Sequence, residues 1–315
     1  MSEGCSSSTK GMFEAQVCSN RRIGGRFYRL RLQFTQDGAK AFANFKPGQF
    51  AELDLSTIAL PAPDAVPQEL LNASGRKILL RRPFSFAEVT TDGDKTFAEL
   101  LYCVVGPATV RMITLSAGNR ISIIGPLGHG FQIPGGKKTV LLVGGGMGTP
   151  PLQHLAQDLT ARNDGIEVIS LSGAKTTEAL PFEGRLDEIS QKLGFSVPEF
   201  ARYGIESLIA TDDGSAGYHG LVTDCLAERL KRTEIHFNDI MICACGPEPM
   251  LARVAQIAGE KKIDCQVSME RRMACGIGLC QSCAVECRVA GSNETVYKLC
   301  CQDGPVFDTK EVVFS

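Results

Sequence analysis

The alternation of short apolar runs with helical stretches constrains the fold more than any other feature of this sequence. From residue 139 the runs TVLLV, IEVISL, ESLIA, IMICA and CQVS each have the length of a strand. Helical periodicity lies between them, near residues 150–162, 179–193, 221–231 and 248–261. Strands separated by helices in this way form a parallel sheet with helices on its faces. We therefore expect an α/β domain over residues 133–270.

Residues 1–132 follow a different rhythm, in which apolar and polar residues alternate. Residues 28–34, for example, carry apolar side chains at every second position, and Gly and Pro separate such runs. This period predicts an antiparallel β-barrel or sandwich. Residues 55–75 contain three prolines without periodicity, so we expect a surface excursion between two strands.

The remaining segment, residues 271–315, is rich in cysteine and poor in apolar periodicity. A module of this size needs a cross-link or a metal centre to be stable. The sequence thus predicts a multidomain chain with divisions near residues 132 and 270.

Composition excludes several classes of partner. The chain has 33 basic and 35 acidic residues, a net charge of −2, and no long run of either sign, so a nucleic-acid-binding face is not expected. No apolar stretch approaches the roughly 18 residues of a membrane span, and the first residues lack the order of an export signal. We expect a cytoplasmic protein with no membrane contact, whose 13 cysteines are reduced.

A glycine-rich turn follows the first strand of the predicted parallel sheet. Gly144, Gly145, Gly146 and Gly148 precede a helical stretch. Glycines allow a backbone to approach a pyrophosphate, and a helix N-terminus favours its charge. The alternative is a tight turn without a ligand, because GGGMGTPP departs from the common dinucleotide fingerprint.

A second candidate lies on the predicted strand RRPFSF at residues 81–86. Arginine, an aromatic ring and a hydroxyl offer a phosphate contact, a stacking surface and a hydrogen-bond donor, which suits a flavin dinucleotide. An ordinary amphipathic strand is the alternative.

The most specific motif is the cysteine spacing near the C-terminus. Cys275, Cys280 and Cys283 form C-x4-C-x2-C, and Cys301 follows after 17 residues. This is the plant-type arrangement for a 2Fe-2S cluster. A structural zinc is less favoured because only one C-x2-C knuckle is present, and the four histidines lie far away, where we expect surface or cap positions. A disulfide cluster is the third alternative.

Taken in order, these motifs resemble the electron-transfer subunits of the NAD-linked, two-flavin dihydroorotate dehydrogenases, within the ferredoxin reductase superfamily. The resemblance covers nearly the whole chain and is most specific in MERRMACGIGLCQSC and YKLCCQDGPVFDTKEVVF. RRPFSF, LYCVVGPATVRM, LLVGGGMG and CGPEPML support it.

The resemblance implies an FAD site in the first domain. Arg82 would face the pyrophosphate and Ser85 would lie near flavin N5, with Pro83 and Phe84 between them. Leu101, Tyr102 and Cys103 resemble the second flavin contact, and Ala108 with Thr109 replaces a phosphate-binding Gly-Thr. Two positions depart from the family pattern, since relatives often have arginine at Cys103 and glycine at Ala108.

The resemblance also implies an NAD site in the second domain. The glycine turn would face the NAD pyrophosphate, and Cys245, Gly246 and Pro247 would lie beside the nicotinamide. Asp212 and Asp213 stand where related NADP enzymes carry Ser-Arg, and their carboxylates would repel a 2′-phosphate. We therefore expect NAD, with a simple turn as the alternative role of the two aspartates.

The resemblance selects Cys301 over Cys300 as the fourth cluster ligand. Adjacent side chains of an extended segment point to opposite faces, so only one of the pair should reach the cluster. Cys300 and Cys287 are then bystanders.

The implied function is electron transfer in pyrimidine (UMP) biosynthesis. A partner catalytic subunit with FMN would oxidise dihydroorotate, and electrons would pass through 2Fe-2S and FAD to NAD, in a heterotetramer. No catalytic acid or base is expected. The partner is needed because no separate barrel of about 250 residues is evident. The alternatives are a stand-alone NAD(P)H:acceptor reductase, a subunit of another oxidoreductase, and a zinc-stapled nucleotide-binding regulatory module.

Overall fold

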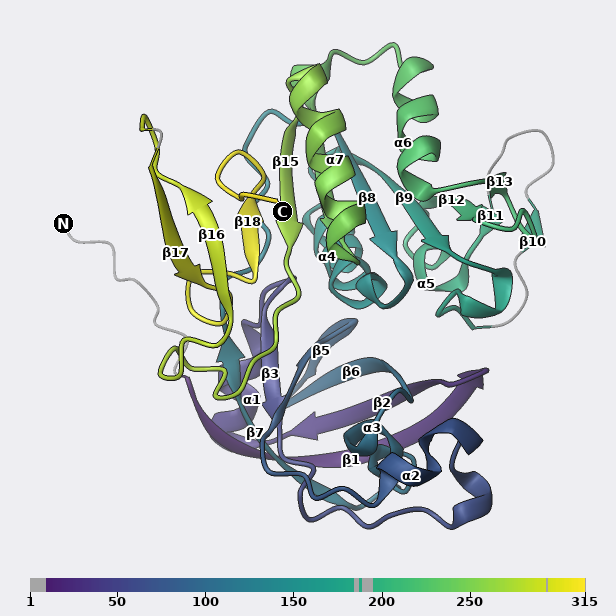
Figure 1. The fold of residues 1–315 in the computed structure, drawn as a ribbon, viewed down its shortest axis with the longest axis vertical. Coiled ribbons are helices and arrows are strands. Elements are labelled where there is room, and N and C mark those ends of the chain that lie inside the picture. The colour runs from purple at the N-terminus through teal and green to yellow at the C-terminus, as the bar shows by residue number, and fades with distance from the viewer. Residues whose placement is uncertain (1–9, 184–186, 189–194, 293, 315) are drawn as a thin grey trace.

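An antiparallel sheet of seven strands forms the N-terminal part of the computed structural model (Figure 1), which describes residues 10–183, 187–188, 195–292 and 294–314. The strand order is β4-β3-β7-β1-β2-β6-β5. The bounds are β1 (Gly11–Gly24), β2 (Phe27–Phe34), β3 (Phe50–Leu53), β4 (Arg82–Ser85), β5 (Glu88–Asp92), β6 (Lys95–Cys103) and β7 (Arg120–Leu127). The sheet curves around its core, which confirms the predicted antiparallel barrel type, although its end strands β4 and β5 do not pair with each other in the described residues.

The alternation in the sequence explains which face of this sheet is buried. Leu30, Leu32 and Phe34 of β2 are fully buried, as period-two patterning predicts. Phe34 stacks on Phe42 of helix α1 (Gln36–Ala43), with ring centroids 4.1 Å apart.

The predicted excursion between two strands is confirmed, and it contains short helices. Residues 54–81 connect β3 to β4 and include η1 (Pro63–Ala65), η2 (Gln68–Leu70) and α2 (Leu71–Ser74). Arg111 of α3 (Pro107–Met112) donates to the Ser74 carbonyl oxygen at 2.8 Å, which fastens the excursion to the sheet domain.

A second sheet confirms the predicted parallel architecture. Its parallel strands are β8 (Thr139–Gly145), β9 (Glu167–Ala174), β12 (Glu206–Thr211), β14 (Ile240–Cys245) and β15 (Asp264–Ser268). Helices α6 (Val222–Lys231) and α7 (Glu248–Lys261) cover one face, while α4 (Thr149–Arg162) and α5 (Pro198–Ala201) cover the other (Figure 1). β13 (Tyr218–His219) pairs with the end of β12. None of the helices in the described residues is long and apolar enough to cross a membrane.

The helix predicted near residues 179–193 is wrong for the residues that the structure describes. The region has the single turn η4 (Thr177–Ala179) and the two-residue strand β10 (Asp187–Glu188), which pairs with β11 (Phe195–Ser196). Residues 184–186 and 189–194 lie outside the described residues. The next helix, α5, begins at Pro198 and carries the fully buried Glu199. Sequence periodicity shows which residues are apolar, but it could not show that this polar residue is buried between the domains.

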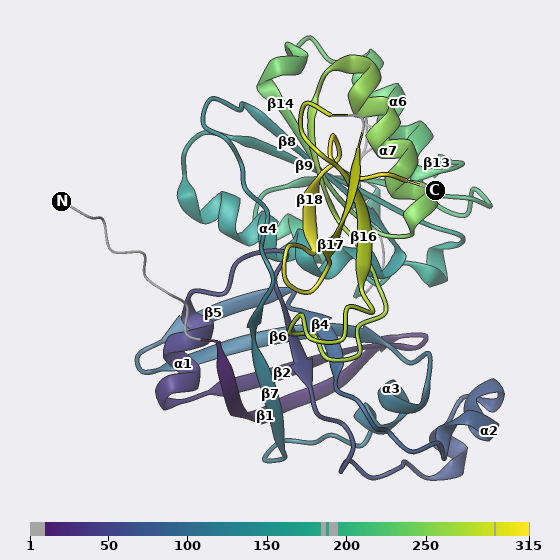
Figure 2. The same cartoon turned by 60° about the vertical axis from the view of Figure 1, so that its left-hand side comes forward.

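The C-terminal segment forms a hairpin and then returns to the second sheet. The hairpin strands are β16 (Ala284–Arg288) and β17 (Thr295–Leu299). β18 (Val306–Asp308) pairs antiparallel with β15 (Figure 1), so the segment adds an edge strand to the second sheet. Figure 2 shows β16, β17 and β18 next to one another. The divisions near residues 132 and 270 stay a prediction about folding units.

One of the four histidines does not lie where the sequence predicted. His129, His219 and His236 are exposed, as expected. His154 lies on α4 with only 5% of its surface exposed and its ring near Phe45. The helix crosses against the first domain there, so a position on a surface helix face becomes an interior one.

Candidate functional site

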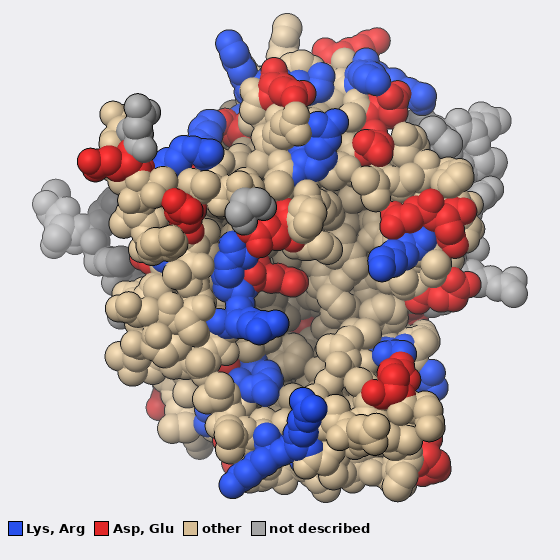
Figure 3. All heavy atoms as spheres, viewed as in Figure 1, with Lys and Arg blue, Asp and Glu red and all other residues tan. Residues whose placement is uncertain are grey.

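A cavity of about 370 Å³ lies between the two sheets and receives residues from all three predicted domains. Figure 3 shows a hollow on this face of the molecule, with Lys and Arg side chains along one edge. The lining combines aromatic and aliphatic side chains with a few polar groups, as ligand pockets do. It comprises Phe50, Pro83, Phe84, Ser85, Leu101, Tyr102, Cys103, Val105, Thr109, Met147, Pro150, Pro151, Cys245, Ser268, Met269, Glu270, Arg271, Met273 and Pro305.

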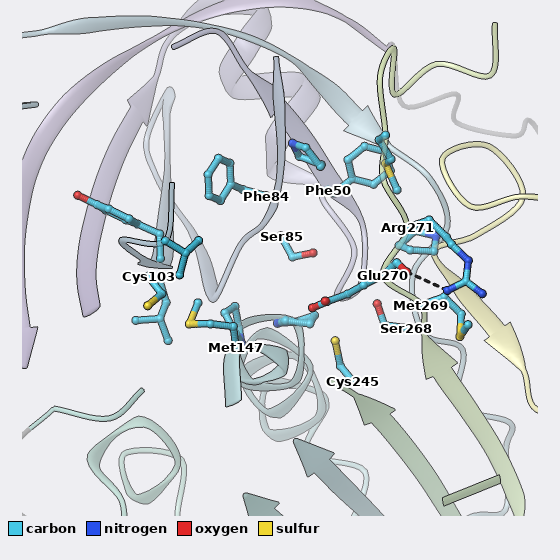
Figure 4. Close-up of a pocket in the computed structure, with 18 of the residues that line it drawn as sticks. Phe50, Phe84, Ser85, Cys103, Met147, Cys245, Ser268, Met269, Glu270 and Arg271 are labelled. Atoms are coloured by element: carbon cyan, nitrogen blue, oxygen red, sulfur yellow. Dashed lines mark hydrogen bonds between the residues drawn. The ribbon is translucent and has the colours of Figure 1, made fainter. Parts of the chain in front are cut away.

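The structure brings eight of the predicted flavin and NAD residues to this cavity. They are Pro83, Phe84, Ser85, Leu101, Tyr102, Cys103, Thr109 and Cys245. The Ser85 hydroxyl points into the cavity, and Phe84 lies beside it (Figure 4). The other predicted residues lie outside the lining, namely Arg82, Ala108, Gly144, Gly145, Gly146, Gly148, Asp212, Asp213, Gly246 and Pro247.

The two arginines before Pro83 have different surroundings. Arg81 donates to the Ser122 carbonyl oxygen at 2.8 Å and lies 3.6 Å from the Asp54 carboxylate, so it ties β4 to its neighbours. Arg82 donates only to the carbonyl oxygens of Leu80 and Arg81, and the described residues place no carboxylate within ion-pair distance of it. Of the two guanidinium groups, that of Arg82 is the one whose charge no carboxylate of the described residues neutralises at ion-pair distance.

Two of the predicted flavin contacts, Tyr102 and Thr109, have side chains that make hydrogen bonds within the protein. The Tyr102 hydroxyl donates to Asn20 Oδ1 at 3.1 Å, and burial raises the pKa of Tyr102. Thr109 Oγ1 accepts from the amides of Val105 and Gly106 at 2.9 and 3.1 Å. Burial raises the pKa of Cys103, so this position offers a neutral thiol.

The glycine-rich turn packs directly on the second NAD motif. A Cβ added to Gly148 would lie 2.0 Å from the Cys245 carbonyl oxygen, and one added to Gly145 would lie 2.9 Å from Pro247 Cδ. Gly148 is thus required for contact between the turn and the end of β14. Gly146 is in the left-handed region at φ +51° with open space around its Cβ position. The pyrophosphate contact of these glycines stays a prediction.

The two aspartates lie at the carboxyl end of β12, away from the cavity lining. Asp213 accepts from the Ser215 amide at 3.0 Å and the Ser215 hydroxyl at 2.6 Å, which lowers the pKa of Asp213 and shapes a turn. Asp212 is exposed, and no side-chain hydrogen bond of it is present in the described residues. Its position leaves a carboxylate available for a ribose hydroxyl.

The four proposed cluster cysteines form two pairs on the loop before β16 and the turn after β17. The Cys280 amide donates to Cys275 Sγ at 3.4 Å, and the Cys301 amide donates to Cys283 Sγ at 3.4 Å. Cys283 and Cys301 are buried, Cys275 is half-buried and Cys280 is exposed. In the described residues no three His, Cys, Asp or Glu side chains converge as a single metal ion requires. Two pairs suit a binuclear cluster, in which each iron takes two thiolates.

The environments of these thiols differ with their exposure. Hydrogen bonds from the Ser282 side chain and amide lower the pKa of Cys280 to about 6. Burial raises the pKa of Cys301 to about 12. Amide donors near sulfur are also the groups that adjust the potential of iron-sulfur centres.

The loop glycines are required by contacts as well as by conformation. Gly276 has φ +67° and a Cβ on it would lie 2.4 Å from Glu52 Oε1. Gly278 has φ +87° and a Cβ on it would lie 2.4 Å from Gln302 Oε1. The paired thiols, amide donors and crowded glycines together fit an iron-sulfur cluster.

The two predicted bystanders have contacts of their own. Cys300 is fully buried and its thiol donates to the Met269 carbonyl oxygen at 3.3 Å. Cys287 is buried on β16. Most other described cysteines are buried too, as expected, while Cys18 and Cys103 are half-buried.

Sequence reasoning missed the segment that joins the cluster loop to the cavity. The Glu270 carboxylate points into the cavity (Figure 4). The surrounding protein desolvates the carboxylate in part, which raises the pKa of Glu270, while the residue as a whole stays exposed. Arg271 holds both oxygens of Glu248 at 2.9 Å, which fixes the segment on the first turn of α7. Both residues lie in the stretch MERRMACGIGLCQSC that carries the resemblance, but the sequence assigned neither of them a role.

Comparison with solved structures places the fold. The NADH-dependent reduced ferredoxin-NADP oxidoreductase has a TM-score of 0.67 at 24% identity, covering 95% of this chain and 90% of that one. A ferredoxin NADP+ reductase from Neisseria gonorrhoeae, solved with bound FAD and NADP, has a TM-score of 0.55 at 15% identity, covering 79% of this chain and 91% of that one. These structures show that the chain has the fold of ferredoxin reductases, and the paired cysteines add a candidate iron-sulfur site to that fold.

Comparison of sequences identifies the family. The model of the iron-sulfur cluster binding domain of dihydroorotate dehydrogenase B matches residues 270–313, and that of the oxidoreductase NAD-binding domain matches residues 142–256. The electron transfer subunit of dihydroorotate dehydrogenase B (NAD+) from Bacillus caldolyticus is 36% identical over 300 residues, which is 94% of this chain and 96% of the relative. The subunit of that name from Caldanaerobacter subterraneus subsp. tengcongensis is 34% identical over 301 residues, 96% of this chain and 98% of the relative. The chain belongs to this family.

Proposed function

We infer that this chain transfers electrons between a dihydroorotate-oxidising partner subunit and NAD, by way of a 2Fe-2S cluster and FAD, in pyrimidine biosynthesis. The observation that carries this inference is the continuity between the cavity and the cluster loop. Residues 268–271 and Met273 line the cavity, and Cys275 follows two residues later. A short covalent path therefore links the two proposed redox sites.

The residues of the chain bind and orient rather than break bonds. When bound, a flavin supplies the conversion between one-electron and two-electron chemistry. Ser85 offers a hydroxyl inside the cavity, Arg82 offers charge for the pyrophosphate, and Phe84 offers an apolar surface. Burial raises the pKa of Cys245 to about 12, so this thiol stays neutral and contributes packing. No general acid or base is assigned.

We propose that the partner subunit docks over the cluster loop. Ile277 and Leu279 on this loop are 47% and 79% exposed, and Tyr297 on β17 is 70% exposed. Ile277 and Leu279 are two residues apart on one loop, and exposed apolar side chains that lie next to one another are typical of interaction surfaces. We further propose a heterotetramer, and a cytoplasmic location, which suits the free thiols of the described cysteines.

The experiment is anaerobic purification of the chain alone and after co-expression with the FMN-containing dihydroorotate dehydrogenase of the same organism. We expect iron, sulfide and FAD in the chain, and a complex of two copies of each subunit that reduces NAD with dihydroorotate. Zinc without iron would indicate the zinc-stapled module. Strong NAD(P)H oxidation by the chain alone, without complex formation, would indicate a stand-alone reductase.

A further inference from the structure

Glu52 is a fully buried carboxyl group without a hydrogen-bond partner. It lies on β3 with 1% of its surface exposed, and neither Oε1 nor Oε2 accepts a hydrogen bond in the described residues. Its backbone pairs with Pro83 of β4 on one side and Ile124 of β7 on the other. A buried carboxyl group without a hydrogen bond lowers the stability of the folded protein, so its presence at this position needs an explanation.

The side chain of Glu52 packs against the cluster loop. The Cβ position of Gly276 lies 2.4 Å from Glu52 Oε1 and 2.6 Å from its Cγ, so only glycine allows this approach. Gly276 is buried, while its neighbour Ile277 is exposed. The loop therefore turns its backbone toward Glu52 at the residue after Cys275.

The positive charges near Glu52 are those of Arg82, the first residue of β4, and of Arg81, which precedes it. Arg82 and Arg81 both act to lower the pKa of Glu52, but burial outweighs them and raises it to about 7. Neither guanidinium lies within ion-pair distance of the carboxylate. When ionised, the group thus holds a negative charge between the proposed flavin strand and the cluster loop.

We propose that Glu52 is a positioning residue for the iron-sulfur cluster, which holds the cluster loop on the first domain and lowers the reduction potential of the cluster by its charge. Reduction adds one negative charge to the cluster, and a carboxylate nearby in a poorly solvated site opposes that addition. The inference rests on the proposed function, because it requires the cluster to be present.

The test is the reduction potential of the cluster in the Glu52→Gln variant of the complete chain, followed by electron paramagnetic resonance in a redox titration at alkaline pH. Glutamine keeps the size of the side chain and removes its charge. We expect iron and sulfide contents like those of the unaltered protein and a shift of the cluster potential to a more positive value. An unchanged potential in a fully loaded variant would overturn the proposal.

Asp54→Asn is the matched control, because it removes the same charge two residues away. Asp54 accepts from Ser56 and lies near Arg81 with a third of its side chain exposed, so solvent screens it. We expect a much smaller shift, and shifts of equal size in the two variants would contradict a specific role of Glu52. Absence of iron from the unaltered protein would instead refute the proposed function, so the two failures are distinguishable.

Discussion

Replacing Glu199 with alanine should weaken the contact between the N-terminal antiparallel sheet and the domain of the second sheet. Glu199 on α5 accepts a hydrogen bond from Arg29 Nη2 on β2 at 2.7 Å. The two side chains are only 1% and 2% exposed. Glu199 Oε1 also accepts from the Glu183 amide at 2.9 Å, so one carboxylate joins three segments of the chain.

The expected loss of stability follows from burial. Alanine at position 199 leaves the Arg29 guanidinium buried with Glu99 as its remaining carboxylate partner. Removal of one member of a buried ion pair costs roughly 3–5 kcal/mol, because the other charge stays desolvated. Because Glu99 still neutralises Arg29, the free energy of unfolding should fall by an amount toward the lower end of that range, with the first loss at the contact between the domains.

The assay is urea unfolding followed by circular dichroism, together with limited proteolysis. Glu183→Ala is the control, because Glu183 pairs with Arg21 at a site where both side chains are more than 40% exposed. An exposed pair contributes at most about 1 kcal/mol. If Glu199→Ala lowers stability no more than Glu183→Ala does, the reasoning from burial is refuted.

Three further predictions concern the cluster, the nucleotide turn and pH. Cys301→Ser should abolish the visible absorption and iron content of the cluster, whereas Cys300→Ser should retain both, because the Cys300 thiol faces the Met269 carbonyl; the reverse result would reassign the ligand. Gly148→Ala should weaken NAD binding in titration calorimetry and lower the melting temperature, because its Cβ would lie 2.0 Å from the Cys245 carbonyl oxygen; unchanged affinity would contradict this. Burial lowers the pKa of His154 from 6.5 to about 4. Between these two pH values the unfolded state binds more protons than the folded state does. The free energy of unfolding is therefore highest above pH 6.5 and falls as the pH drops toward 4. His154→Gln should remove roughly 3 kcal/mol of that pH dependence in unfolding curves, and a slope equal to that of the unaltered protein would refute the pKa.

Much of the fold was predictable because its signals are local. The period-two alternation in β2 and the apolar runs of β8 and β14 each lie within a few residues. The failure near residues 179–193 has the same origin, because periodicity reports which residues are apolar but not which element they will pack against. His154 shows this directly, since a neighbouring domain buries a position on a helix face.

The candidate site was predictable only in part. The spacing of Cys275, Cys280 and Cys283 identifies a cluster because a short loop must bring its ligands together. Ser85 and Cys245 were proposed from motifs, and the structure places both on one cavity. Glu270 lies in the stretch that carries the resemblance, but the sequence assigned it no role, and its carboxylate reaches the cavity because β15 ends two residues before it.

The sequence by itself determined the order of the elements and the cysteine spacing, since both depend on residues close together in the chain. Tertiary structure alone decided which charged groups lost contact with water. Glu52 meets Gly276, and Arg29 meets Glu199, across separations that no local pattern spans. The energy of a charge depends on its solvation and its partners, so the electrostatics of the two proposed redox sites arises only when the three parts of the chain pack together.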